Sequence, residues 1–227
     1  MDYWFIIILA AASMIGGRLI IKSIKKSQDK REDYQAIAQQ FGWSYMREKA
    51  SDNFGHYDIF SDSADDWALK IVFISGGATH GSVTRRIDWH SPSGALPDGE
   101  AVLGAPLPEK TVSVLQSGGG IGSSLTKAAI KGTMYALGKT KFSLTLDEAT
   151  AGDPGGIVLA SSGQEHAMNA LRRSEALAQF RETRKEVDVP VIIRDETGLT
   201  LRRPNVTHDA AELKAIVELG KDLRADL

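Results

Sequence analysis

Two pairs of histidine and aspartate are the side chains whose types and spacing best suit chemistry in this sequence. His56 and Asp58 lie two residues apart, and so do Asp88 and His90. Residues two apart in a β-strand project from the same face, so two adjacent strands could gather two imidazoles and two carboxylates. Such a set suits zinc or another divalent metal ion. The simpler alternative is a solvated polar sheet face, where the same alternation also places these residues.

Other catalytic and cofactor-binding motifs are incomplete. The glycine-rich segment 117–124 lacks the third glycine of a dinucleotide-binding loop, and the tripeptide 138–140 lacks the opening glycine of a P-loop. Neither Gly-x-Ser-x-Gly nor His-Glu-x-x-His occurs, and the chain has no cysteine for a disulfide, a thiolate metal site or a thiol nucleophile. The sequence therefore favours a function without catalysis and without a cofactor.

An apolar segment near the N-terminus predicts a transmembrane helix. Residues 3–21 contain Arg18 as their only charged side chain, and their nineteen residues would span about 28 Å, close to the roughly 30 Å hydrocarbon core of a bilayer. Tyr3 and Trp4 would lie in one interfacial belt, and Arg18 could reach the headgroups at the other end. A cleaved signal peptide is the alternative, but here the basic residues follow the apolar segment. We therefore assign residues 1–21 to an uncleaved anchor.

The charge distribution predicts the orientation of this anchor. Residues 18–31 carry six basic side chains and one acidic side chain, a net charge of +5, whereas residues 32–227 carry 21 basic and 27 acidic side chains, a net charge of −6. Positive charge on the C-terminal flank predicts a single-pass protein of the cell inner membrane with its C-terminal domain in the cytoplasm. The basic juxtamembrane segment 22–33 suits anionic lipid headgroups and begins with Lys22, Lys25 and Lys26. The acidic remainder argues against nucleic acid as a partner.

The anchor also contains a run of small residues, among them Ala12, Gly16 and Gly17. Small side chains allow a second transmembrane helix to approach closely. We therefore expect the anchor to pack against another integral membrane protein. The alternative is that these residues merely tolerate lipid.

After residue 33 the spacing of apolar residues indicates first a helix and then strands. Tyr34, Ile37, Ala38 and Phe41 have helical spacing, and Gly42 follows as a C-cap. Thereafter the period is two, and short connections without helices predict antiparallel pairing. The strand-rich α+β part, residues 34–116, contains predicted strands at 56–60, 67–74, 82–90, 101–103 and 111–115.

The rest of the chain is predicted to mix helices with strands. Residues 117–141 form a glycine-rich loop and a basic helix of small residues, and residues 142–227 form an α+β C-terminal part. The predicted elements of this last part are strands at 142–146 and 156–160, a long helix at 164–185, a hairpin of 191–194 with 199–203, and a final amphipathic helix that begins at Asp209. The predicted fold class is α+β: one N-terminal transmembrane helix followed by a mainly antiparallel sheet covered by helices.

In this layout the chain resembles bacterial single-pass membrane proteins with a soluble α+β domain. The residues that prompt the resemblance are Phe41-Gly42-Trp43, Gly55, Trp67, Trp89 and the Gly198 hairpin before the final helix. That group has no established activity, so the resemblance implies a layout and a location but no catalytic residue.

The predicted function is that of a membrane-anchored, non-enzymatic protein. It would bind another protein or serve as an accessory subunit of a larger inner-membrane complex. Two alternatives stay open: a membrane-tethered metal-dependent enzyme that uses the two His–Asp pairs, and a sheet domain that binds a lipid or another ligand.

Overall fold

The computed structural model describes residues 30–50, 55–62, 64–75, 83–104, 145–146, 155–164, 166–184, 189–204 and 209–227. The chain divides into two units, residues 1–45 and residues 46–227. In the first unit a helix occupies residues 30–41. It ends at Gly42, whose φ is 73°, and the Trp43 N–H donates to the Ala38 carbonyl over 2.8 Å. This left-handed ending confirms the predicted C-cap, since glycine adopts a positive φ without a steric penalty.

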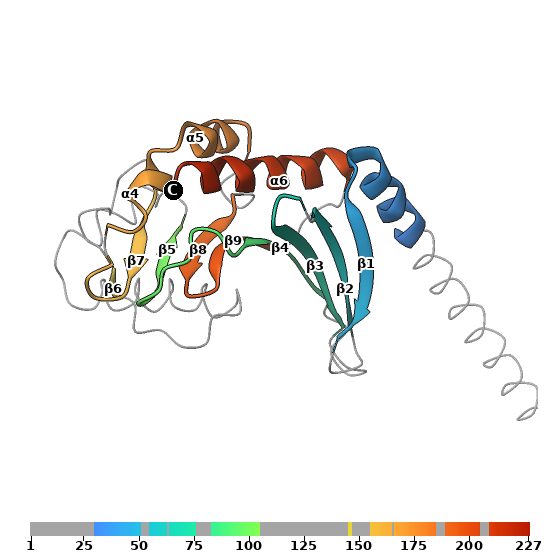
Figure 1. The fold of residues 1–227 in the computed structure, drawn as a ribbon, viewed down its shortest axis with the longest axis horizontal. Helices are drawn as coiled ribbons and strands as arrows, with labels where there is room; N and C mark the ends of the chain where they lie inside the picture. The colour runs from blue at the N-terminus through green and yellow to red at the C-terminus, as the bar shows by residue number, and fades with distance from the viewer. Residues whose placement is uncertain are drawn as a thin grey trace, which may run out of the picture. The chain divides into compact units, whose positions relative to one another are not determined.

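An antiparallel sheet forms the framework of the rest of the fold (Figure 1). Every pairing from β2 to the far edge at β6 is antiparallel, as the sequence predicted. The order across the sheet is β1 (Ser44–Lys49), β2 (Gly55–Asp62), β3 (Trp67–Ser75), β4 (Val83–Ser91), β9 (Gly198–Pro204), β8 (Val191–Asp195), β5 (Ala101–Leu103), β7 (Val158–Ala160) and β6 (Thr145–Leu146).

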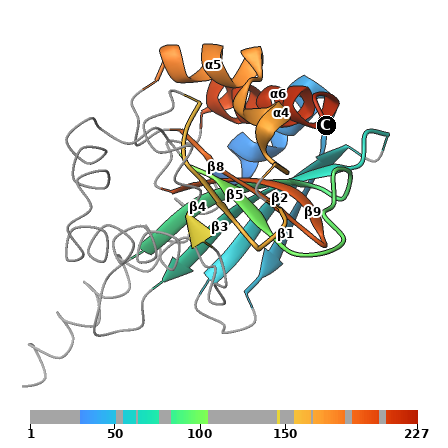
Figure 2. The same ribbon diagram turned by 90° about the vertical axis from the view of Figure 1, so that its left-hand side faces the viewer.

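Three helices cover one face of this sheet: α4 (Asn169–Arg172), α5 (Glu175–Glu182) and α6 (Ala210–Ala225). Figure 2, turned by 90°, shows all three on the same side. The main core lies between them and the sheet. The buried residues that α6 contributes to this core include Leu213, Ile216, Val217 and Leu223. They have the helical spacing that is expected of a helix face packed on a sheet. The α+β class is thereby confirmed.

The register of the strands aligns the alternating apolar residues of β2, β3 and β4 on one buried face of the sheet. Leu69 of β3 lies directly opposite Phe60 of β2 and Trp89 of β4, and all three are fully buried. Ile71 lies two residues further along and faces Ile87 in the same way. Since directly paired residues share a face, apolar residues at every second position build one continuous layer.

The predicted long helix at 164–185 was wrong. The structure has two short helices there, α4 and α5, separated at Ser174. Ser174 has extended backbone angles (φ −60°, ψ 125°), and its hydroxyl accepts the Leu177 N–H, so it is the N-cap of a new helix. The predicted start of the final helix was correct, because the Asp209 carboxylate accepts the Glu212 N–H over 2.8 Å.

Several predicted segments fall partly or wholly outside the described residues. The strand at 111–115 and the helix within 117–141 lie outside, and only 145–146 of the strand at 142–146 lies inside, as β6. The anchor at residues 1–21, most of segment 22–33 and all the residues assigned to the membrane lie outside: Tyr3, Trp4, Ala12, Gly16, Gly17, Arg18, Lys22, Lys25 and Lys26. Among the described residues, no helix combines the length and the apolar character needed to cross a bilayer.

Candidate functional site

The face of the sheet that the helices cover, here the helix face, is identified by Trp89. A Cβ atom on Gly220 of α6 would lie only 2.3 Å from the Trp89 ring, so the two pack directly together. Asp58 and Ile71 are directly paired, as are Ile71 and Ile87, and Ile87 is two residues from Trp89. The buried Asp58 carboxylate therefore projects from the helix face as well.

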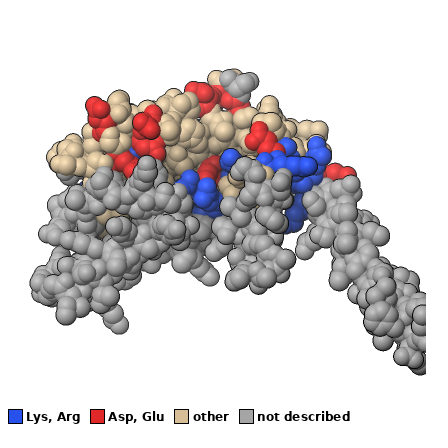
Figure 3. Space-filling view, turned by 90° about the horizontal axis from the view of Figure 1, so that it is seen from below, with Lys and Arg blue, Asp and Glu red and all other residues tan. Residues whose placement is uncertain are grey.

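The opposite face, here the lower face, carries a row of charged residues. Lys70 of β3 is paired with Asp88 of β4, which is paired in turn with Arg202 of β9. Figure 3 views this side of the molecule, where Lys and Arg atoms gather beside acidic ones. Asp88 is held by two arginines, with 3.1 Å from its Oδ2 to Arg86 Nε and 2.8 Å from its Oδ1 to Arg202 Nε. Asp88 and its two arginines join β4 to β9 and together carry a net charge of +1.

The four residues predicted as metal ligands are divided between these two faces. His56 and Asp58 project from the helix face, whereas Asp88 and His90 project from the lower face. In addition, β3 lies between β2 and β4, so the two strands are not adjacent as the prediction required. Within the described part of the chain, no three histidine, aspartate or glutamate side chains are grouped so that they could hold a metal ion. The structure therefore keeps each pair together but separates the two pairs.

Asp58 makes a structural ion pair instead. Its carboxylate is 0% exposed and receives Arg47 Nε at 2.6 Å and Arg47 Nη2 at 3.0 Å. His56 Nε2 lies 3.4 Å from the same carboxylate, and its ring stacks on Phe73 with centroids 4.6 Å apart. A two-pronged guanidinium–carboxylate contact is the geometry that compensates best for the burial of a charge. Asp58 therefore stabilises the pairing of β1 with β2.

A cleft of about 380 Å³ opens at one end of the sheet, and it contains His90. Ser61, Ala68 and His90 form one row across β2, β3 and β4. The β2–β3 turn and the residue after β4 complete the lining, which consists of Ser61, Asp62, Asp66, Trp67, Ala68, His90 and Pro92. Its volume lies near the small end of the range for ligand pockets. Among the described residues, this cleft is the candidate binding site.

His90 lies half-buried in this cleft and is held by Thr200. The distance from His90 Nδ1 to Thr200 Oγ1 is 3.0 Å. Burial lowers the pKa of His90 below its ordinary value of 6.5, although Asp195, Asp66 and Asp88 act in the opposite direction. The imidazole is therefore neutral at pH 7 and can offer a donor or an acceptor to a ligand without adding positive charge.

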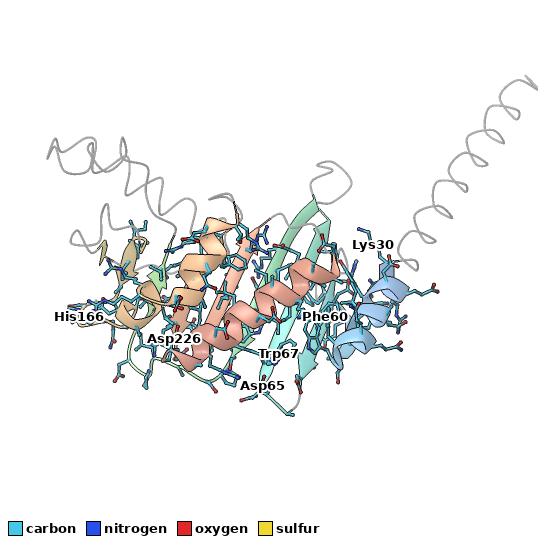
Figure 4. All side chains as sticks on the ribbon, turned by 90° about the horizontal axis from the view of Figure 1, so that it is seen from above. Lys30, Phe60, Asp65, Trp67, His166 and Asp226 are labelled. Carbon is cyan, nitrogen blue, oxygen red and sulfur yellow. The ribbon has the colours of Figure 1, made fainter. Side chains whose placement is uncertain are left out.

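The three aspartates at the end of β2 and in the β2–β3 turn have two different environments. Asp65 points toward α6, where Lys221 Nζ and Arg224 Nη2 each lie 2.5 Å from its carboxylate oxygens (Figure 4). Hydrogen bonds from Lys221 and then from Arg224 lower the pKa of Asp65. Asp62 and Asp66 instead line the cleft. Asp66 has a positive φ of 47°, and its carbonyl accepts the Ser91 hydroxyl, which fixes the turn beside the end of β4.

The sequence indicated His90 but not the residues that surround it. Thr200 lies 110 residues away in the chain, and it reaches His90 only because β4 pairs with β9. Asp62 and Asp66 belong to no ligand-binding motif in the sequence. The sequence shows a polar turn between two strands with alternating apolar residues. Such a pattern locates the turn but does not indicate whether the turn borders a cleft.

The chain shows no significant match to a known protein family, a curated protein or a solved structure. The layout-level resemblance to bacterial single-pass membrane proteins therefore stays a prediction.

Proposed function

We propose that this chain is a non-enzymatic, single-pass inner-membrane protein whose cytoplasmic α+β domain binds another protein, as an accessory subunit of a larger membrane complex. The observation that carries the proposal is the apolar segment 3–21, whose C-terminal end and the residues after it (18–31) carry a net charge of +5. That order of segments favours an uncleaved anchor and a cytoplasmic domain.

The folded domain supports a binding role in two ways. The ionisable groups that the sequence suggested for metal chemistry are divided between two faces, and Asp58 and Asp88 are each engaged by arginine. The cleft beside His90 offers a recessed surface of the size that accepts a small molecule or one side chain of a partner. That cleft also favours a second candidate, a sheet domain that binds a small ligand.

The anchor provides a direct test of the partner hypothesis. Ala12 and Gly16 lie one turn apart on one side of the predicted helix, and the double substitution Ala12→Leu, Gly16→Leu would block close approach while keeping the segment apolar. We expect the native chain, purified from membranes in mild detergent, to retain a stoichiometric integral membrane protein that the double variant loses. Mass spectrometry of the purified material measures both.

A matched control uses the opposite side of the same predicted helix. Ala10→Leu adds bulk and Met14→Leu conserves volume, both about half a turn away from Ala12 and Gly16, and this double variant should keep the partner. If the native chain yields no stoichiometric partner, or both double variants lose it equally, the proposed helix contact is wrong.

A further inference from the structure

Positive charge on the lower face of the sheet exceeds what its one carboxylate can neutralise. Lys70 of β3 lies directly opposite Asp88 of β4, and Arg86 lies two residues before Asp88, so Lys70 and Arg86 are diagonal neighbours on this face. The Asp88 carboxylate receives Arg202 Nε at 2.8 Å and Arg202 Nη2 at 3.0 Å, which is a two-pronged contact. Three basic side chains and one acidic side chain therefore leave a net charge of +2 here.

Lys70 and Arg86 both have hydrogen-bond donors without an anionic partner in the described part of the chain. Lys70 Nζ lies 3.7 Å from the centre of the Tyr57 ring and makes no ion pair there. Arg86 contacts Asp88 through Nε alone, at 3.1 Å, so its two terminal Nη groups stay available. Both side chains are half-buried, and that of Arg86 is 26% exposed. Because charges interact more strongly where water is partly excluded, this pair favours a bound anion.

The geometry points to a binding site for one phosphate group between Lys70 and Arg86. The terminal Nη groups of Arg86 donate to two phosphate oxygens, since the planar guanidinium matches the spacing of those oxygens. The Lys70 ammonium adds a second positive charge from the neighbouring strand. The Tyr57 ring holds this ammonium in place through a cation–π contact.

The phosphate could come from dissolved phosphate or from the headgroup of an anionic phospholipid, and we assign it to the phospholipid. Eight residues, 22–29, lie between the predicted anchor and the helix at 30–41, and they reach at most about 28 Å. In the proposed function, the domain therefore stays beside the anionic cytoplasmic leaflet. The choice of the lipid rests on that proposed function, whereas the phosphate site itself does not.

The test uses the full-length chain in maltoside micelles without phosphate, labelled with fluorotyrosine. The chain has five tyrosines, and Tyr57→Phe assigns the Tyr57 resonance in fluorine NMR. The probes are inorganic phosphate and dihexanoyl phosphatidic acid, and the matched control ligand is dihexanoyl glycerol, which lacks only the phosphate. We expect both phosphate probes to shift the Tyr57 resonance saturably, the lipid at lower concentration. The buried Tyr34 of the first unit should not respond.

Two results would contradict this inference at different levels. If neither phosphate probe shifts the Tyr57 resonance, or if dihexanoyl glycerol shifts it equally, the phosphate site is wrong. If inorganic phosphate binds as tightly as the phosphatidic acid, the site stands but the lipid is not its ligand.

Three variants identify the residues responsible. Lys70→Gln and Arg86→Gln should each weaken the phosphatidic acid about tenfold, the loss typical for a hydrogen bond to a charged group. Neither should unfold the domain, because Lys70 makes no ion pair in the described residues and Arg202 still holds Asp88. Arg173→Gln removes the same charge from an exposed residue at the end of α4 and should leave the affinity unchanged. Equal weakening by all three variants would show long-range electrostatics rather than a site.

A conservative substitution separates the charge of Lys70 from its packing. Lys70→Arg keeps the positive charge and should bind the phosphatidic acid more tightly than Lys70→Gln does. If both variants bind it equally weakly, the charge of Lys70 does not hold the phosphate and the inference fails.

The partner purification distinguishes this inference from the proposed function. If the native chain retains its membrane partner while the Tyr57 resonance ignores both phosphate probes, the phosphate site fails and the proposed function stands. If the chain retains no partner while phosphate still shifts the Tyr57 resonance, the proposed function fails and the phosphate site stands.

Discussion

The buried carboxylates of Asp58 and Asp88 are each paired with arginine side chains. Asp58 is fully buried and held by both prongs of Arg47, while Asp88 is shared between Arg86 and Arg202. Removing one partner of such a pair would leave an uncompensated charge, which costs more than the intact pair contributes. These residues therefore hold neighbouring strands together.

Burial of His90 disfavours the charged form of its imidazole. Its folded-state pKa is below the ordinary value of 6.5, so the unfolded chain binds the proton more readily than the folded chain does. The stability that neutral His90 contributes is complete above pH 6.5 and is lost as the pH falls through the folded pKa. The nearby carboxylates of Asp66, Asp88 and Asp195 reduce this effect without reversing it.

We predict that the His90 proton resonances titrate with a midpoint below 6.5, as measured by NMR on the full-length chain. We also predict that His90→Gln, which can still hydrogen-bond Thr200, reduces the loss of stability between pH 6.5 and the folded pKa. The readout is the free energy of unfolding from urea titrations at several pH values. A midpoint at or above 6.5 would contradict the burial argument.

At the scale of elements, α6 connects the two halves of the sheet. Its first turn carries Glu212, which makes ion pairs with Arg203 of β9 and with Arg184 beyond α5. Its last turns carry Lys221 and Arg224, which hold Asp65 in the β2–β3 turn. Between these ends, the absence of a side chain at Gly220 lets the helix approach the Trp89 ring.

Gly220→Ala should therefore destabilise the domain, although alanine favours helices. A Cβ atom would lie 2.3 to 2.7 Å from three atoms of the Trp89 ring, closer than non-bonded atoms can approach. Overpacking of this kind costs about 1–3 kcal/mol, against a gain in helix propensity of about 1 kcal/mol. We expect a net loss of free energy of unfolding in urea titrations followed by circular dichroism.

Two further variants test the cause of that loss. Asp222→Ala, on an exposed residue of the same helix, should change stability by less than about 0.5 kcal/mol. Trp89→Leu combined with Gly220→Ala should lose less stability than the sum of the single variants, because the smaller side chain makes room for the new methyl group. Strict additivity would show that Gly220 and Trp89 do not interact as the structure places them.

At the scale of the whole molecule, the segment order predicts where the domain lies. A cytoplasmic reporter fused after Leu227 should be active, and an alkaline phosphatase fused at the same residue should be inactive, because positive charge follows the apolar segment. Substitution of Lys22, Lys25, Lys26, Lys30 and Arg31 by glutamate should weaken or invert insertion. Active phosphatase on the native chain would place the domain outside the cytoplasm and favour the signal-peptide alternative.

The sequence by itself determined the local elements of the fold. Strict alternation located β2, β3, β4 and the β8–β9 hairpin within one or two residues, and Asp209 with Glu212 located the start of α6. These signals are local, because the backbone period of a strand or helix is fixed within a few residues. Ser174 was misread because serine is tolerated inside helices as well as at their N-caps.

Only the tertiary structure decided which elements meet. Each His–Asp pair does lie on one face, as alternation requires, but the register through β3 aligns Asp58 with Ile87 rather than with Asp88. A difference of one residue in register moves a side chain to the opposite face of a sheet, so His56 and Asp58 are separated from Asp88 and His90. The pairing of β4 with β9, which brings Thr200 to His90, depends likewise on packing between segments that are far apart in the chain.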